Sequence, residues 1–391
     1  MTQKILRTTL TIFMTLAFTT GAFAFTYTAT EVINNFAFNA AKILSDKPGD
    51  FFFSPYSILS AFGMAYAGTN NATATEIEEV LGFSRENQTS FGELIRDIDK
   101  SKFLSSANRI WLRDGLNLKQ AYKDDTALYY GSTLGELDFF NQPDESRKTI
   151  NAWVSEKTNG KIQDLLATIE PDTQMILTNA VYFNAEWKDK FNKKSTEPKK
   201  FYINDNNETN VSMMRAHREY MFGEFNDFKI IRLPYKGYRL SMVVVLPPKG
   251  QENKLDTIDA KTFNQWLVSL EEYEVDLWLP KFKTEKRYEL KDLFRDLGVK
   301  LAFSNFADFS GITDDEKLKV DNVIHKTFID VDEDKTEAAA ATAVTMMRAT
   351  ALPVTKLKPK AEFHADHPFM YCIMDNYTGT ILFMGRQTFA K

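Results

Sequence analysis

The 391-residue sequence predicts an α+β fold in a single domain, and three observations support this prediction. Signals for helices dominate the first third of the chain after its leader, and signals for strands dominate later. Helices and strands do not alternate regularly, as they do in α/β folds with a parallel sheet. No internal repeat and no low-complexity linker divides the chain. Length alone allows one large domain or two ordinary ones, so the missing linker favours one.

The first 24 residues have the pattern of a signal peptide, which is removed and does not belong to the fold. Two basic residues precede a largely apolar run at 8–19, and the small-x-small sequence at 22–24 fits a cleavage site. The run is short for a membrane span, and no later stretch reaches about 18 uninterrupted apolar residues. We therefore expect the mature protein, residues 25–391, to be secreted, into the extracellular space or the periplasm, without membrane contact. An uncleaved membrane anchor is the alternative.

Three segments carry helical signals. In the first, apolar residues recur at helical spacing, at Val32, Phe36, Ala40 and Ile43. In the second, Ser54 supplies a capping oxygen directly before Pro55, a combination typical of helix starts. The third segment, residues 291–297, ends at Gly298, as helices commonly do. We expect a helix in each place.

Three other segments carry strand signals. Residues 242–246 form an apolar run that ends at two prolines, which is typical of a buried strand. Residues 275–279 alternate between apolar and other side chains before Pro280, and residues 179–183 have a similar character. We expect a strand in each place.

The composition and the motifs exclude several classes of function. A net charge of −5 gives no support to a nucleic-acid partner. The sequence lacks a Gly-x-Ser-x-Gly elbow, a Gly-rich phosphate loop and an HExxH motif, so we assign no catalytic residue, no metal ligand and no cofactor. The single cysteine, Cys372, lies among apolar residues and is expected to be a buried structural thiol. We do not expect an enzyme.

The segment at 333–350 is unusual because its side chains are sorted by parity. The even positions carry small or apolar groups that become bulkier along the segment: Thr336, Ala338, Ala340, Thr342, Val344 and Met346. In an extended strand these six side chains point to one face and the odd ones to the other. Such a segment can be exposed in one state and buried as a strand in another. Thr336, Glu337 and four alanines also fit a capped helix start, so the segment itself leaves both conformations open.

Separated motifs along the chain resemble landmarks of the serpins, the family of serine protease inhibitors. In chain order they are FFSPYS at 52–57, NAWV at 151–154, Asn179 followed by Trp187, LPYKG at 233–237, PKF at 280–282, ADFSGI at 307–312, DHPFMY at 366–371 and LFMG at 382–385. They cover nearly the whole mature chain in the order of the family. The sequence is therefore similar to the serpins over residues 25–391.

The resemblance implies a serpin fold with a large, mostly antiparallel sheet of five strands, further sheets, eight to nine helices and an exposed reactive loop at about 333–355. It also implies a monomeric suicide-substrate inhibitor that traps a serine protease as the acyl-enzyme. Cleavage frees the first half of the loop, which enters the main sheet as a new strand and displaces the attached protease. The same motion can trap a thioester, so a cysteine protease is a further candidate target.

The resemblance assigns roles to individual residues. The hinge of the reactive loop comprises Glu333, Lys335, Thr336, Glu337, Ala338, Ala339, Ala340 and Ala341. The residues that control opening of the sheet are Ser54, Asn179, Trp187 and His325. The inhibitory pattern has glycine at position 335, and Lys335 departs from it. Glycine suits a hinge because it can adopt backbone conformations that cost other residues about 1–3 kcal/mol. A non-inhibitory serpin, acting as a carrier, chaperone or storage protein, is therefore the alternative function.

Two bonds are candidates for cleavage. The usual family interval from Glu333 places the bond at Ala349–Thr350, and a small residue before the bond suits an elastase-like protease. An interval one residue shorter gives Arg348–Ala349, which suits a trypsin-like protease with an acidic pocket. The sequence leaves both bonds open.

Overall fold

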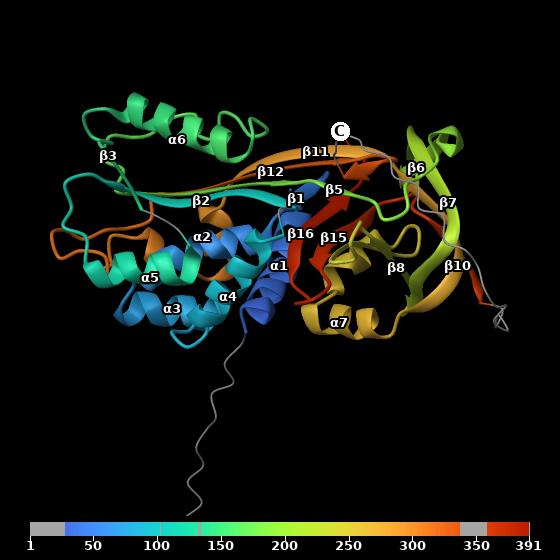
Figure 1. Ribbon diagram of the computed structural model, residues 1–391, viewed down its shortest axis with the longest axis horizontal. Helices are drawn as coiled ribbons and strands as arrows, with labels where there is room; N and C mark the ends of the chain where they lie inside the picture. The colour runs from blue at the N-terminus through green and yellow to red at the C-terminus, as the bar shows by residue number, and fades with distance from the viewer. Residues whose placement is uncertain (1–27, 102, 132–133, 337–357, 391) are drawn as a thin grey trace, which may run out of the picture.

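The structure is a computed structural model that describes residues 28–101, 103–131, 134–336 and 358–390. The predicted signal peptide at 1–24 lies outside the described residues. The hinge residues Glu337 to Ala341 and both candidate bonds, around Ala349, lie outside them as well. The described part of the chain contains two sheets and eight α-helices (Figure 1), so the predicted α+β class is confirmed.

The α-helices of the described residues include the three that the sequence predicts. They are α1 (Ala29–Ser45), α2 (Pro55–Ala67), α3 (Asn71–Leu81), α4 (Gln88–Asp99), α5 (Gln120–Tyr130), α6 (Pro143–Lys157), α7 (Ala260–Val268) and α8 (Lys291–Leu297). Short 3₁₀ helices lie at Lys193–Ser195, Glu252–Thr257 and Leu301–Phe303. The Ser54 side chain accepts a hydrogen bond from the Ser57 N–H and so caps α2, as predicted. Among the described residues, no helix has both the length and the apolar character needed to cross a membrane.

One sheet has nine strands within the described ranges, in the order β1-β16-β15-β9-β8-β7-β10-β14, with β6 paired to β7. Its strands are β1 (Phe51–Phe53), β6 (Glu197–Asn204), β7 (Asn207–Phe225), β8 (Phe228–Pro234), β9 (Leu240–Leu246), β10 (Glu271–Pro280), β14 (Lys360–His364), β15 (Phe369–Asp375) and β16 (Ile381–Gln387). The strands predicted at 242–246 and 275–279 are confirmed as parts of β9 and β10.

The other sheet has seven strands in the part of the chain described, in the order β3-β2-β4-β12-β13-β5, with β11 paired to β12. Its strands are β2 (Leu104–Arg113), β3 (Gly135–Leu137), β4 (Met175–Phe183), β5 (Ala185–Glu186), β11 (Phe282–Glu289), β12 (Asn322–Val331) and β13 (Lys335–Thr336). The predicted five-stranded sheet corresponds to β3, β2, β4, β12 and β11, and the two-residue strands β13 and β5 extend it at one end. Four of the six pairings are antiparallel, while β2 with β3 and β4 with β12 are parallel.

Both faces of the seven-stranded sheet are covered. Helix α6 lies on one face, and α2 to α5 lie on the other side (Figure 1). Under α6, Ile150 and Val154 pack with Ile176 and Ile324 of the sheet in a small separate core. The main core lies on the opposite face.

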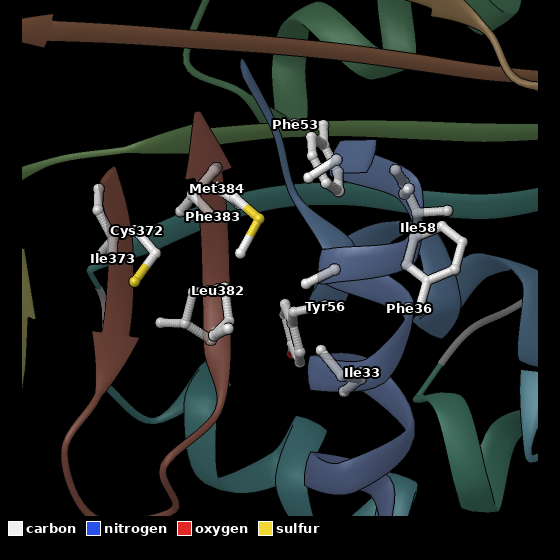
Figure 2. Packing of buried hydrophobic residues seen from close by; sticks show 14 of the residues in the cluster. Ile33, Phe36, Phe53, Tyr56, Ile58, Cys372, Ile373, Leu382, Phe383 and Met384 are labelled. Carbon is white, nitrogen blue, oxygen red and sulfur yellow. The ribbon is translucent and has the colours of Figure 1, made fainter. Parts of the chain in front are cut away.

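Helix α2 runs through the main core, which explains why every one of its residues is buried. Figure 2 shows where α1 and α2 meet β15 and β16, with Phe36, Ile58 and Leu382 among the side chains in the cluster. Cys372 belongs to this core and is 1% exposed, so the predicted buried thiol is confirmed. Dense apolar packing of this kind fixes the position of the sheet residues that face the core.

Candidate functional site

Strands β4 and β12 are parallel neighbours at the centre of the seven-stranded sheet. They pair from Ile176–Asn322 to Tyr182–Phe328. A parallel pair is slightly less stable per residue than an antiparallel one. A strand inserted antiparallel to both would therefore replace one weaker pairing by two stronger ones.

Two residues of the predicted hinge, Lys335 and Thr336, lie between β12 and β5 at one end of the sheet. Thr336 of β13 pairs with Val331 of β12 on one side and with Ala185 of β5 on the other. Lys335 pairs with Glu186, and β13 runs antiparallel to both neighbours. Since β5 follows β4 after one residue, β13 occupies the place where the β4–β5 segment and β12 have separated.

A buried polar cluster lies on the main-core side of the β4–β12 pair; we define it as Ser54, Ser57, Asn108, Asn179 and His325. All except Asn108 are completely buried. The Ser54 N–H donates to His325 Nε2 at 3.0 Å, and the Ser54 hydroxyl donates to the Leu382 carbonyl at 2.6 Å. Ser54 thereby connects the start of α2 to both β12 and β16.

The hydrogen bonds of His325 fix its tautomer. Since Nε2 accepts the Ser54 N–H, the proton of the neutral ring lies on Nδ1 and is donated to Asn179 Oδ1. Burial lowers the pKa of His325 to about 3. The ring is therefore neutral at physiological pH, and the bond to Asn179 crosses directly from β12 to β4.

Asn179 distributes this connection to two further elements. Its amide Nδ2 donates to Asn108 Oδ1 on β2 at 2.6 Å and to Ser57 Oγ on α2 at 2.5 Å. The Ser57 hydroxyl in turn donates to Asn108 Oδ1 at 2.8 Å. The polar cluster therefore joins β2, β4, β12 and α2 through neutral groups alone.

Trp187 lies apart from the polar cluster, at the end of the sheet next to the hinge. Its indole Nε1–H donates to the Asp332 carbonyl at 2.8 Å. Its ring stacks on Tyr235, with centroids 4.6 Å apart and planes 8° from parallel. Trp187 therefore holds the backbone between β12 and β13 against the end of β5.

Glu333 lies two residues before β13, and its carboxylate holds this part of the chain in place. The residue is only 5% exposed. Its Oε2 accepts from Lys281 Nζ at 2.6 Å, and its Oε1 accepts from the Thr196 hydroxyl at 2.8 Å. Burial tends to raise the pKa of this carboxyl, but the two hydrogen bonds outweigh that effect and the pKa is lowered. The Phe191 N–H also donates to the Glu333 carbonyl, at 2.9 Å.

Asp334 adds charged pairs nearer the solvent. Its carboxylate forms ion pairs with Lys193 and, at 3.7 Å, with Lys190. The hydrogen bond from Lys193 lowers the pKa of Asp334. The Asp334 side chain is 38% exposed, so solvent screens these pairs. We call the whole group, Glu333 and Asp334 with Lys190, Lys193, Lys281 and Thr196, the hinge anchor.

The structure brings Ser54, Asn179 and His325 together. It places Trp187 elsewhere, next to the chain that leads into the hinge. Sequence reasoning missed Ser57 and Asn108 as members of the cluster. Ser57 lies one helical turn after Ser54 in the same motif, so its spacing could have indicated it. Asn108 has no such local signal, because only the pairing of β2 with β4 places it opposite Asn179. The roles of these residues in opening the sheet stay predictions.

Metal binding has no structural support in the described ranges, where no group of three or more His, Cys, Asp or Glu side chains is placed to hold an ion.

Comparisons with known proteins agree with the fold. A family model described as "Serpin (serine protease inhibitor)" matches residues 31–388. An uncharacterized serpin-like protein from Thermococcus kodakarensis is 39% identical over 364 residues, 91% of this chain and 84% of that protein. Human Serpin B3 is 37% identical over 369 residues, 87% of this chain and 93% of that protein.

Solved structures give the same result. The structure described as a tumour suppressing serpin is 28% identical, has a TM-score of 0.83, and matches 92% of this chain and 99% of that chain. The complex of thyroxine-binding globulin with thyroxine is 29% identical, has a TM-score of 0.81, and matches 92% of this chain and 98% of that chain.

Proposed function

The chain belongs to the serpin family, and we propose that it is a suicide-substrate inhibitor of serine proteases. The family consists mostly of protease inhibitors rather than enzymes, and its members generally target proteases. In our proposal a protease cleaves the reactive loop and forms an acyl-enzyme. The freed segment then inserts between β4 and β12 before the acyl bond is hydrolysed.

The observation that carries this proposal is the register of β13. If its pairs were extended two residues at a time from Thr336 onwards, Thr342 would lie opposite His325 on one side and opposite Asn179 on the other. His325 and Asn179 already face each other in the β4–β12 pair. The same register therefore serves the closed sheet and the sheet with an inserted strand.

The register also supports the parity of the loop. Side chains directly opposite each other in a sheet share one face. Thr336, Ala338 and Ala340 would then share the face of Val331, Ile329 and Thr327, which are at most 1% exposed. Val331 and Ile329 belong to the main core. The even-numbered side chains that would enter the main core first are therefore small, as a densely packed core requires.

The inserted segment would reach far along the sheet. Residues 336–349 form a strand of roughly 45 Å at ~3.3 Å per residue. A protease attached at its end would move by a similar distance toward the opposite end of the molecule. Distortion of its oxyanion hole and catalytic residues then stops deacylation.

We assign the control of insertion to two groups of residues. Ser54, Asn179 and His325 hold β4 to β12 in the polar cluster, and Trp187 holds the chain before β13. The hinge, from Glu333 through Lys335 and Thr336 to Ala341, enters first.

We place the reactive bond at Ala349–Thr350, with Arg348–Ala349 as the alternative. The first bond suits an elastase-like protease and the second a trypsin-like protease. A cysteine protease is a further target, since a thioester can be trapped in the same way. The inhibitor acts as a monomer.

Incubation of the purified protein with elastase and, separately, with trypsin tests the proposal. Denaturing gels should show a covalent band with the mass of the protein plus the protease, less the released C-terminal peptide. Mass spectrometry should show that this peptide begins at Thr350 after incubation with elastase. A peptide that begins at Ala349 assigns the bond to Arg348. Cleavage by both proteases without a covalent band contradicts the inhibitory function.

A second function has its own support. Lys335 stands where inhibitory serpins have glycine, and the similar thyroxine-binding globulin is a binding protein by name. A non-inhibitory serpin that carries or binds a partner would be cleaved as a substrate in the same experiment. It would also show no gain in heat resistance after cleavage.

We further propose that the protein is secreted after removal of residues 1–24. Expression with the full leader, followed by N-terminal sequencing of protein from the medium or the periplasm, should give a chain that starts at Phe25. A chain that retains Met1 in the membrane fraction contradicts this proposal.

A further inference from the structure

The chain that follows α6 crosses the outer face of the seven-stranded sheet, which is the face that α6 covers (Figure 1). We call residues 159–166 the strap. Alternate residues of the strap contact four neighbouring strands in their order across the sheet. These contacts join Asn159 to Ser105 of β2 at 3.3 Å, Lys161 to the Tyr182 ring of β4 at 5.5 Å, the Gln163 carbonyl to Lys326 of β12 at 2.9 Å and the Leu165 carbonyl to Arg287 of β11 at 2.7 Å. The strap therefore crosses the β4–β12 pair between Lys161 and Gln163.

On the side of β2 and β4, the strap is attached by apolar packing and by buried hydrogen bonds. Ile162, Leu165 and Leu166 are at most 2% exposed and belong to the small core under α6. Asn151 of α6 donates to the Leu166 carbonyl at 2.9 Å and accepts from the Leu166 N–H at 2.8 Å. Among the described residues, β12 gives this core one buried member, Ile324, and β11 gives none. The strap and α6 thus belong to the half of the sheet that contains β2 and β4.

Two cations hold the strap to the other half of the sheet. They are Lys326 of β12 and Arg287 of β11, which donate to the two strap carbonyls. Each cation also lies beside a carboxylate of β11. Lys326 Nζ is 3.0 Å from Glu285 Oε1, and Arg287 Nη1 is 3.1 Å from Glu289 Oε1. Because these carboxylates stay with the cations, release of the strap leaves no charge unpaired, and the two hydrogen bonds can break and re-form.

We propose that Lys326 and Arg287 form a latch that holds the β4–β12 pair closed from its outer face. The polar cluster holds the same pair from the main-core side, so each face of the sheet has its own fastening. When β12 and β11 move away from β4, the strap stays with α6 and the two hydrogen bonds of the latch break. Hydrogen bonds from charged donors are stronger than neutral ones, so the latch lowers the frequency with which the pair opens.

Hydrogen–deuterium exchange of the purified protein tests the latch, because exchange reports how often backbone amides open. Lys326→Met and Arg287→Met each remove one hydrogen bond to the strap and keep an apolar stem. Each variant should raise the exchange rate at 176–182 and 322–328 about five- to tenfold. Exchange at 242–245 and 370–373, where β9 pairs with β15 in the other sheet, should be unchanged.

Two further variants locate the effect. Lys326→Arg keeps a cation at this position, so it should exchange like the unmodified protein. Lys283→Met removes a cation of β11 whose Nζ lies 4.7 Å from the Phe328 ring of β12, a contact within one half of the sheet, and it should leave exchange unchanged. The latch is overturned if Lys326→Met or Arg287→Met exchanges like the unmodified protein, if exchange rises equally in both sheets, or if Lys283→Met has the same effect.

A second step rests on the proposed function: a weaker latch lets the cleaved loop enter the sheet sooner. Both methionine variants should then give more covalent complex, relative to cleaved product, with the protease that the unmodified protein traps. An unchanged ratio together with faster exchange overturns this second step alone. Failure of the proposed function has a different result, namely no covalent complex with any of these proteins, while the exchange rates still decide whether the latch exists.

Discussion

The polar cluster and the hinge anchor lie at two levels along the boundary between β12 and the β4–β5 segment, but they use opposite chemistry. The polar cluster contains neutral side chains, four of them completely buried, which are joined by hydrogen bonds. The hinge anchor contains two carboxylates and three lysines; Glu333 is buried, whereas Asp334 and the lysines are partly exposed. The deeper contact between the strands is thus neutral, and the outer one is ionic.

In the proposed mechanism, the two regions would resist opening of the sheet to different extents. A buried neutral network has no charge to desolvate, yet the loss of one member leaves its partners unsatisfied at a cost of about 1–3 kcal/mol each. Partly exposed ion pairs contribute about 0–1 kcal/mol each and can be exchanged for water. In the proposed mechanism, the hinge anchor would adjust the start of insertion, whereas the polar cluster would have to rearrange before Thr342 could enter between His325 and Asn179.

The largest expected effect is that of a charge carried into the gap by the loop. Ala340→Glu would place a carboxylate between Thr327 and Val181, which are completely buried. Burial of an unpaired charge costs several kcal/mol, so insertion should stall and the variant should be cleaved as a substrate. The measurement is the yield of covalent protease complex on denaturing gels.

Ala339→Glu is the matched control for this change. In the same register its side chain lies on the other face, between Tyr182 and Phe328, whose rings are 5.5 Å from Lys161 Nζ and 4.7 Å from Lys283 Nζ. The neighbouring cations should let this variant keep most of its inhibitory yield. Equal yields from the two variants mean that the register derived from β13 is wrong.

Removal of a member of the polar cluster should have the next largest effect. His325→Ala leaves the Ser54 N–H and Asn179 Oδ1 without their partner and creates a cavity. We expect a loss of about 2–5 kcal/mol in the free energy of unfolding. Urea denaturation measures this loss, and a change below about 1 kcal/mol contradicts the importance of the cluster.

The two regions should also lose stability at different pH. Burial lowers the pKa of His325 in the folded protein to about 3, from an ordinary value of 6.5. The unfolded chain then binds more protons between these values, so this contribution is complete above pH 6.5 and falls as pH decreases toward 3. The lowered pKa values of Glu333 and Asp334 act later, below their ordinary values of 4.5 and 3.8.

Comparison with a variant isolates the histidine. Between pH 6.5 and pH 4.5 the unfolding free energy of the unmodified protein should fall, and that of His325→Gln should fall less. The difference between the two decreases should be about 1 kcal/mol or more. Identical slopes for the two proteins in this interval would show that His325 does not titrate as a buried neutral ring.

A smaller effect is expected in the hinge anchor. Glu333→Gln loses the charge that accepts from Lys281, and we expect about 1–2 kcal/mol of lost stability because the side chain is nearly buried. Asp334→Asn is the control, with less than about 0.5 kcal/mol expected for its exposed pairs. Thermal unfolding compares them, and an equal loss in both contradicts the distinction between buried and exposed members.

The sequence predicts the fold class and much of the polar cluster for an identifiable reason. The capping role of Ser54 can be predicted because a serine before a proline is a local signal for a helix start. Asn179 and His325 are predicted by the resemblance to the serpin family. Asn108 and Lys281 could not be found in this way. Asn108 reaches the cluster only through strand register, and Lys281 meets Glu333 across a sequence separation of 52 residues. Contacts between residues far apart in the sequence cannot be predicted from the residues next to either of them.

Lys335 allows the smallest and most specific change in this comparison, because it lies in β13 between the two regions. Its backbone pairs with Glu186, at the point from which insertion would proceed in our proposal. Glycine at this position lowers the cost of strained backbone states by about 1 kcal/mol, so Lys335→Gly should speed insertion about fivefold and convert cleaved product into covalent complex. Rapid-mixing kinetics with elastase measures the ratio of the two products. If that ratio does not change, the backbone at 335 does not limit insertion, and the rate is set deeper in the gap, where the polar cluster must part.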